Sequence, residues 1–108
     1  MNGIYEYQQE SHGNIVGHIL VRVSETNKSY RFMLLENTTR YDYDHFILLF
    51  KGKETATVYK EKSPHSMQIW SDNDFTIYPM RAGIPFYFVR VGEEKEKTSC
   101  RGNATVII

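Results

Sequence analysis

The sequence predicts an all-β protein, a compact antiparallel barrel or sandwich of about eight or nine short strands. β-branched and aromatic residues alternate with polar ones along most of the 108 residues, which is the period-two pattern of half-buried strands. Gly, Asn, Asp, Ser or Pro interrupts this pattern about every ten residues, and no segment shows a sustained helical period. Of the two architectures we favour the barrel.

The expected strands follow one another with short connections. They cover residues 4–8, 14–24, 30–36, 46–50, 55–60, 66–70, 75–78, 84–91 and 104–108. Gly17 interrupts the longest strand and indicates a bulge or a close approach of another backbone. On the same face as Gly17 this strand carries Ile15, Ile19, Val21 and Val23. The polar segment 25–29 that follows predicts a hairpin turn.

The second half of the chain contains several strong turn signals. Segment 46–50 is apolar throughout, which predicts a central strand buried on both faces. Turns at 51–54 and 61–64 then predict that 46–50, 55–60 and 66–70 form successive hairpins, and the Asp/Asn cluster at 71–74 predicts a further turn. We expect the apolar end, 104–108, to pair as a strand within the domain or across a dimer.

The size and charge of the chain limit its organisation and its partners. A chain of 108 residues is predicted to form one β domain over 1–108. Thirteen basic and thirteen acidic residues give zero net charge, which lacks the electrostatic signature of a dedicated duplex-binding protein. The same balance leaves little self-repulsion, so a homodimer is one arrangement that the sequence allows.

Several sequence features predict a cytoplasmic protein. The lone Cys100 cannot form an intrachain disulfide, and the first ten residues do not resemble a signal peptide. No apolar run approaches the roughly 20 residues that a membrane helix needs, so we expect no membrane partner. Frequent Ile, Lys, Asn and Tyr are typical of AT-rich bacterial and phage genomes, which suits a small accessory protein of a phage or mobile element.

No motif of catalysis or metal binding emerges. The four histidines lack zinc-site spacing, and the nearest approach to a metal site is Asp42, Asp44 and His45, without the glycine-containing loop of a calcium site. Arg101 beside Cys100 could lower the pKa of the thiol, but no cysteine-enzyme signature surrounds it. We therefore expect no catalytic residues, no metal and no cofactor, and the chain is more consistent with a binding protein than with an enzyme.

The aromatic residues are the most informative candidates for function. Tyr, Met and Arg, which concentrate between residues 78 and 90, are enriched at binding hot spots, whereas Ile77, Phe86 and Phe88 are the core residues in the alternative interpretation. Two tyrosines lie in the polar connection 37–44, and two aromatics flank the turn at 71–74. The candidate partner-binding residues are Tyr41, Tyr43, Trp70, Tyr78, Arg81 and Tyr87.

The sequence is consistent with three functions. The leading interpretation is a non-enzymatic module, a regulator or inhibitor that presents aromatic residues and an edge strand to a protein partner. The second is a barrel that stacks single-stranded nucleic acid on its aromatics, with phosphates along Lys51, Lys53, Lys60 and Lys62. The third is a barrel with a pocket for a small ligand, closed by the connections at 37–44 and 92–103.

Overall fold

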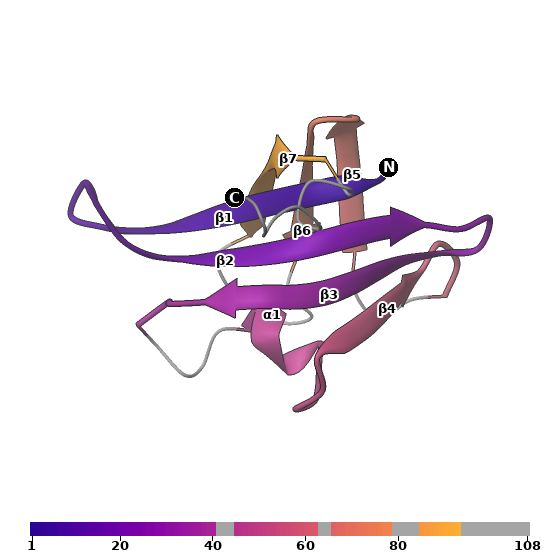
Figure 1. Cartoon of the computed structure of the whole chain (residues 1–108), viewed down its shortest axis with the longest axis horizontal. Helices are drawn as coiled ribbons and strands as arrows, with labels where there is room; N and C mark the ends of the chain where they lie inside the picture. Colours follow the sequence, from indigo (N-terminus) through magenta and orange to yellow (C-terminus); the bar gives the residue numbers. More distant parts are fainter. Residues whose placement is uncertain (41–44, 63–65, 79–84, 94–108) are drawn as a thin grey trace, which may run out of the picture.

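The chain folds into a single antiparallel sheet of seven strands that curls into a half-barrel (Figure 1). The computed structural model describes residues 1–40, 45–62, 66–78 and 85–93. In chain order the elements are β1 (Gly3–Ser11), β2 (Asn14–Glu25), β3 (Ser29–Asn37), α1 (His45–Leu48), β4 (Thr55–Tyr59), β5 (Ser66–Ser71), β6 (Asp74–Tyr78) and β7 (Phe86–Gly92). Strands β1 to β3 run across the front of the view, and β5 to β7 cross behind them in a nearly perpendicular direction.

The strand order explains why the sheet remains open. The order is β4-β3-β2-β1-β7-β6-β5, and every neighbouring pair is antiparallel. Because seven is an odd number, the two edge strands β4 and β5 run in the same sense along the sheet. Their direct pairing would be parallel, and a parallel connection needs a crossover of about a dozen residues or more. Only residues 60–65 join β4 to β5, so this linker cannot supply such a crossover.

Short polar turns set the register of the hairpins. His12 and Gly13 both have positive φ, which is the geometry of a two-residue turn that matches the twist of β1 and β2. The predicted turn after β2 is confirmed: the Ser29 amide donates to Thr26 Oγ1 at 3.0 Å. The predicted turn at 71–74 is confirmed too, with the Asn73 amide donating to Ser71 Oγ at 2.9 Å between β5 and β6.

The core lies between the two crossing halves of the sheet and is built largely from aromatic rings. As the alternation in β2 predicts, Ile19, Val21 and Val23 face inward and are fully buried, while Ile15 lies exposed near the hairpin turn. The remaining buried hydrophobic residues are Tyr5, Phe32, Phe46, Phe50, Ala56, Val58, Phe75, Ile77, Phe86 and Phe88. The alternative in which Ile77, Phe86 and Phe88 belong to the core is therefore confirmed.

The prediction of a central strand at 46–50 is wrong, because this segment contains the short helix α1 and its terminal turn. Phe46 and Phe50 are four residues apart, so one helical turn places both rings on the same side, with their centroids 5.5 Å apart. The Phe46 ring also lies 6.2 Å from Phe32 of β3 and 5.0 Å from Phe88 of β7. Because all five residues of 46–50 are apolar, they show neither a helical nor a strand periodicity. Tertiary contacts therefore decide which conformation this segment adopts.

The prediction of successive hairpins through 55–70 is also wrong. β4 pairs with β3 and β5 pairs with β6, so the two strands lie at opposite edges of the sheet. The predicted strand at 104–108 lies outside the described residues. Seven of the nine expected strands are therefore observed, in an all-β antiparallel fold. Within the described ranges, no helix has the length and apolar character that crossing a bilayer requires.

Gly17 permits the close backbone approach that its position in β2 predicts. The Thr38 amide donates to the His18 carbonyl at 2.8 Å, which holds the segment after β3 against β2. A Cβ atom at Gly17 would lie only 2.8 Å from Thr39 Cα. The pairing with β1 shifts register beside this glycine, between Gln9 and Glu10, so the bulge predicted for β2 is present as well.

Replacing Gly17 with alanine should destabilise the fold by about 1–3 kcal/mol, because the added methyl group displaces the backbone at Thr38 and Thr39. Urea unfolding monitored by circular dichroism measures this change. An unchanged free energy of unfolding would show that the backbone approach is not required.

Replacing Phe46 with alanine should reduce the free energy of unfolding by about 3–5 kcal/mol, because the ring is 1% exposed and contacts both halves of the sheet. The matched control is Ile15→Ala, which removes an exposed side chain and should cost less than about 1 kcal/mol. Similar losses in the two variants would contradict a central role for α1.

Candidate functional site

The outer surface of β5, β6 and β7 carries exposed aromatic side chains from all three strands. Trp70 of β5 is 56% exposed, Tyr87 of β7 is 49% exposed and Tyr78 of β6 is 36% exposed. Strand alternation explains this arrangement, because the neighbours Ile69, Ile77, Phe86 and Phe88 point to the opposite side and pack in the core. We call the surface formed by Trp70, Asp74, Thr76, Tyr78, Tyr87 and Val89 the aromatic face.

Three of the six candidate partner-binding residues thus lie on one continuous surface. Trp70 and Tyr87 flank Thr76: the Trp70 indole contacts it, and Tyr87 is directly opposite it in the β6–β7 ladder. Tyr78 is two positions beyond Thr76 on the same side of β6. The other three candidates, Tyr41, Tyr43 and Arg81, lie outside the described residues. Binding by any of the six stays a prediction.

Side-chain hydrogen bonds hold the two most exposed rings of the aromatic face in place. Trp70 Nε1 donates to Thr76 Oγ1 at 2.9 Å, and the Tyr87 hydroxyl donates to Asp74 Oδ2 at 2.6 Å. The second oxygen of Asp74 accepts a hydrogen bond from Ser71 Oγ, also at 2.6 Å. These contacts fix each ring against the sheet while its surface remains open to solvent, which lowers the conformational entropy lost on binding.

The hydrogen bonds to Asp74 keep the network in one protonation state. The Ser71 hydroxyl, followed by the Tyr87 hydroxyl, stabilises the carboxylate and lowers the pKa of Asp74 below its usual range. The same contact with Asp74 raises the pKa of Tyr87, because the phenol must donate its proton to remain bonded. At neutral pH, Asp74 is therefore ionised and Tyr87 is protonated.

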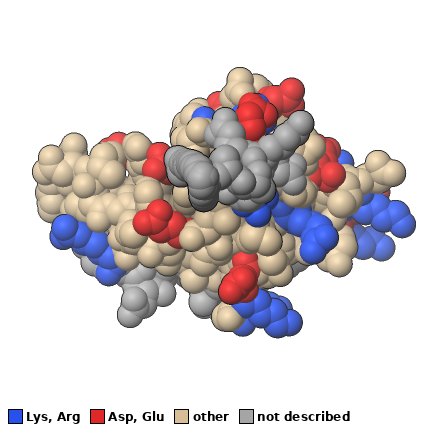
Figure 2. All heavy atoms as spheres, viewed as in Figure 1, with Lys and Arg blue, Asp and Glu red and all other residues tan. Residues whose placement is uncertain are grey.

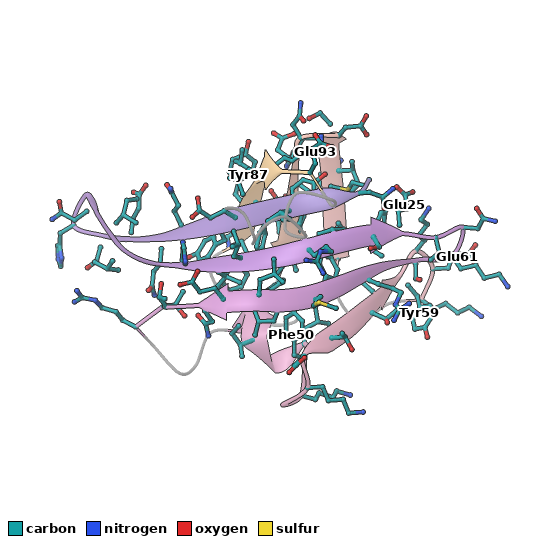
Figure 3. All side chains as sticks on the ribbon, viewed as in Figure 1. Glu25, Phe50, Tyr59, Glu61, Tyr87 and Glu93 are labelled. Atoms are coloured by element: carbon teal, nitrogen blue, oxygen red, sulfur yellow. The ribbon has the colours of Figure 1, made fainter. Side chains whose placement is uncertain are left out.

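The charge of the aromatic face is low and slightly negative. β5 and β6 contain no Lys or Arg, and Asp74 is their one charged residue. β7 contains a single basic residue, Arg90, whose Nη2 donates to the Asn2 carbonyl at 2.9 Å and to Glu93 at 2.8 Å. Figure 3 places Tyr87 on β7, well apart from Tyr59 and Glu61 near the end of β4.

Val89 and Val91 were not among the sequence candidates, although both are exposed apolar residues of β7. Val89 lies opposite Asp74 and extends the aromatic face toward β1. The period-two pattern contained this information, because inward positions at Phe86 and Phe88 imply outward positions at Tyr87 and Val89. The sequence did not show which of the two faces of β7 packs against the core.

A second polar cluster lies on the outer surface of β1, β2 and β3. His18 Nδ1 contacts Glu6 Oε2 at 2.7 Å, and His18 Nε2 contacts Glu36 Oε1 at 3.1 Å. Partial burial of the ring opposes its protonation, but the hydrogen bonds to Glu6 and Glu36 outweigh this effect and raise the pKa of His18. Sequence reasoning missed the cluster because its three members are far apart along the chain and meet only through strand pairing.

Most of the remaining chemical candidates fall where the structure gives no description. Asp42, Asp44 and Cys100 lie outside the described residues, and His45 is the first residue of α1. Among the residues that the structure describes, no group of three His, Cys, Asp or Glu side chains is arranged to hold a metal ion.

The four lysines proposed as a phosphate-binding stripe are separated by β4. Lys51 and Lys53 precede this strand, while Lys60 and Lys62 follow it. Lys60 Nζ is 2.7 Å from Glu25 Oε2 and lies above the Tyr30 ring. Lys60 and Lys62 line a surface hollow of about 410 Å³ between β4 and β5. They therefore do not form a continuous stripe with Lys51 and Lys53.

The His18 cluster predicts a pH-dependent contribution to stability. Since the pKa of His18 is raised in the folded state from 6.5, its contribution is complete below about pH 6.5 and is lost as the pH rises through the folded-state value. We expect less than about 1 kcal/mol, because the cluster is partly solvated. In urea unfolding at pH 5, the free energy of unfolding of wild type should exceed that of His18→Gln. This difference should shrink as the pH rises to 9. His12→Asn is the control and should retain the wild-type pH dependence.

Comparison with known proteins supplies no function for this chain. No family model matches it, no curated protein is significantly similar to it, and no solved structure matches its fold significantly. Any function must therefore be argued from the chain's own residues and surfaces.

Proposed function

We propose that this protein is a non-enzymatic binding module that docks a protein partner on the aromatic face of β5, β6 and β7. The observation that carries the proposal is the fixed exposure of Trp70 and Tyr87, whose polar atoms are bonded to Thr76 and Asp74. Tryptophan and tyrosine are the side chains most enriched at energetic hot spots of protein interfaces. Exposed rings on a rigid sheet supply such anchors with little ordering cost.

The edge strand β5 adds a second means of recognition beside this face. β5 pairs with β6 on one side, and its sequence, Ser-Met-Gln-Ile-Trp-Ser, contains no charge and no proline. The opposite edge strand β4 is flanked by Lys53 and Lys60, and charged residues of this kind discourage pairing with another strand. An extended segment of a partner could therefore pair along β5 while its side chains contact Trp70.

Electrostatics favour a protein over a single-stranded nucleic acid as the partner. Stacking platforms for nucleic acid combine aromatic rings with basic side chains that contact the phosphates. The described part of the aromatic face carries the carboxylate of Asp74, and Arg90 is already engaged with Asn2 and Glu93. A phosphate backbone would meet repulsion here, whereas an apolar or weakly basic protein surface would not.

Replacing Trp70 and Tyr87 together with alanine should weaken partner binding by about 2 kcal/mol or more, about a 30-fold rise in Kd. The partner is first sought by affinity capture from the producing cells, and its Kd is then measured by calorimetry with purified proteins. Because both side chains are about half exposed and each makes one hydrogen bond, the melting temperature of the double variant should fall modestly, and the Kd is measured at a temperature where this variant is folded.

The matched control is Tyr59→Ala, which removes an exposed ring from β4 at the opposite edge of the sheet. Partner binding should survive this change. The proposal is wrong if every captured protein binds the double variant and Tyr59→Ala equally well. It is also wrong if labelled single-stranded oligonucleotides bind wild type in a salt-dependent manner and the double variant does not.

A further inference from the structure

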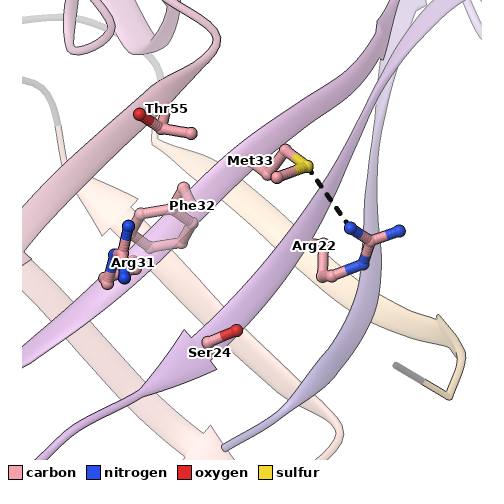
Figure 4. Close-up of a pocket in the computed structure, with 6 residues that line it drawn as sticks. All are labelled: Arg22, Ser24, Arg31, Phe32, Met33 and Thr55. Carbon is pink, nitrogen blue, oxygen red and sulfur yellow. Dashed lines mark hydrogen bonds between the residues drawn. The ribbon is translucent and has the colours of Figure 1, made fainter. Parts of the chain in front are cut away.

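A hollow on the outer surface of β2, β3 and β4 is lined by two arginines and lies on a part of the sheet separate from the aromatic face (Figure 4). It has a volume of about 230 Å³ and is lined by Arg22, Ser24, Arg31, Phe32, Met33 and Thr55. Arg22 is opposite Met33 in the β2–β3 ladder, and Ser24 is opposite Arg31. Arg22 and Arg31 are therefore diagonal neighbours, a separation that long side chains can bridge.

Neither arginine has a carboxylate partner among the described residues. None of the ion pairs in that part of the chain includes Arg22 or Arg31. Arg22 Nη1 donates to the Met33 thioether sulfur at 3.3 Å, and a thioether is a weak acceptor. Figure 4 shows Arg22 and Arg31 on opposite sides of the hollow, and a dashed line joins Arg22 to Met33.

The Arg22 guanidinium contains a donor that lacks an acceptor. Like the Nε of Arg90, its Nε is shielded from solvent and has no hydrogen-bond partner within the described part of the chain. A buried donor without a partner is costly, and nearly all such groups in folded proteins are paired with protein, water or ligand. A guanidinium offers five N–H donors in a plane, which matches the oxygen atoms of a phosphate group or a carboxylate.

We propose that this hollow binds the phosphate group of a phosphate monoester, held by Arg22 and Arg31. Two guanidinium groups supply the positive charge, and the hydroxyl-bearing Thr55 adds a polar side chain to the lining. The tetrahedral distribution of phosphate oxygens suits donors on two sides of a hollow better than a planar carboxylate does. The volume of about 230 Å³ leaves space for the group that carries the phosphate.

The surrounding charges favour one phosphate group over a long polyanion. Figure 2 shows acidic and basic side chains interspersed on the face turned to the viewer, without an extended basic track. Glu36 follows Met33 by three residues in β3, and Glu54 immediately precedes Thr55. A nucleic-acid backbone that extended beyond the hollow would pass these carboxylates, whereas a single phosphate would meet only the two arginines.

The test is a titration of 15N-labelled protein with inorganic phosphate, followed by two-dimensional NMR. Saturable shifts should concentrate at the amides of Arg22, Ser24, Arg31 and Met33. Arg22→Gln and Arg31→Gln should each raise the Kd at least about tenfold, because each removes charge-assisted hydrogen bonds. Arg31 is exposed, so its replacement should leave the fold intact even if the Arg22 variant is destabilised.

Arg40→Gln is the matched control, since it removes the same charge from an exposed position beyond the end of β3. Its Kd should remain close to that of wild type. A phosphoserine peptide and a small sugar phosphate then distinguish a protein ligand from a metabolite as the source of the phosphate. The proposal is overturned if no saturable shifts occur, if Arg40→Gln weakens binding as much as Arg31→Gln, if acetate binds as tightly, or if only oligonucleotides bind.

Discussion

The contact of Phe46 with both halves of the curled sheet is the interaction on which the rest of the structure depends. Its ring meets Phe32 on β3 and Phe88 on β7, strands that lie far apart in the sheet order. The sheet cannot close on itself, because its two edge strands run in the same sense and the linker between them is short. Helix α1 therefore packs against the concave side of this open sheet.

Aromatic rings fill the concave side of the sheet, and both of the sites that we propose lie on its outer side. Phe75 and Phe88 stack with their centroids 5.0 Å apart, and the Phe46 ring lies 5.0 Å from Phe88 on the same inner side. Two hollows lined by described residues lie at the surface, one between β4 and β5 and one on the outer face of β2 to β4.

The two outer surfaces of the sheet differ in chemistry although one continuous sheet forms both. On β5 to β7, the exposed rings of Trp70 and Tyr87 donate hydrogen bonds to the Thr76 hydroxyl and to the Asp74 carboxylate. On β1 to β3, charged side chains form the contacts: His18 lies between two glutamates, and Arg22 has no carboxylate partner in the described ranges. Strand pairing produces both clusters, since each joins side chains from neighbouring strands that are distant in sequence.

The sequence by itself determined the fold class, most strand positions, the inward face of β2 and the turns at 25–29 and 71–74. These features depend on local periodicity and on backbone preferences of turn residues, which a short window contains. Tertiary structure decided that 46–50 forms helix and turn instead of strand, that β4 and β5 lie at opposite edges, and which aromatics are exposed. An apolar pentapeptide satisfies either conformation, and a strand's outward face is defined only by what covers the other one. The pairing of His18 with two glutamates and the isolation of Arg22 likewise arise from strand register, which no local pattern specifies.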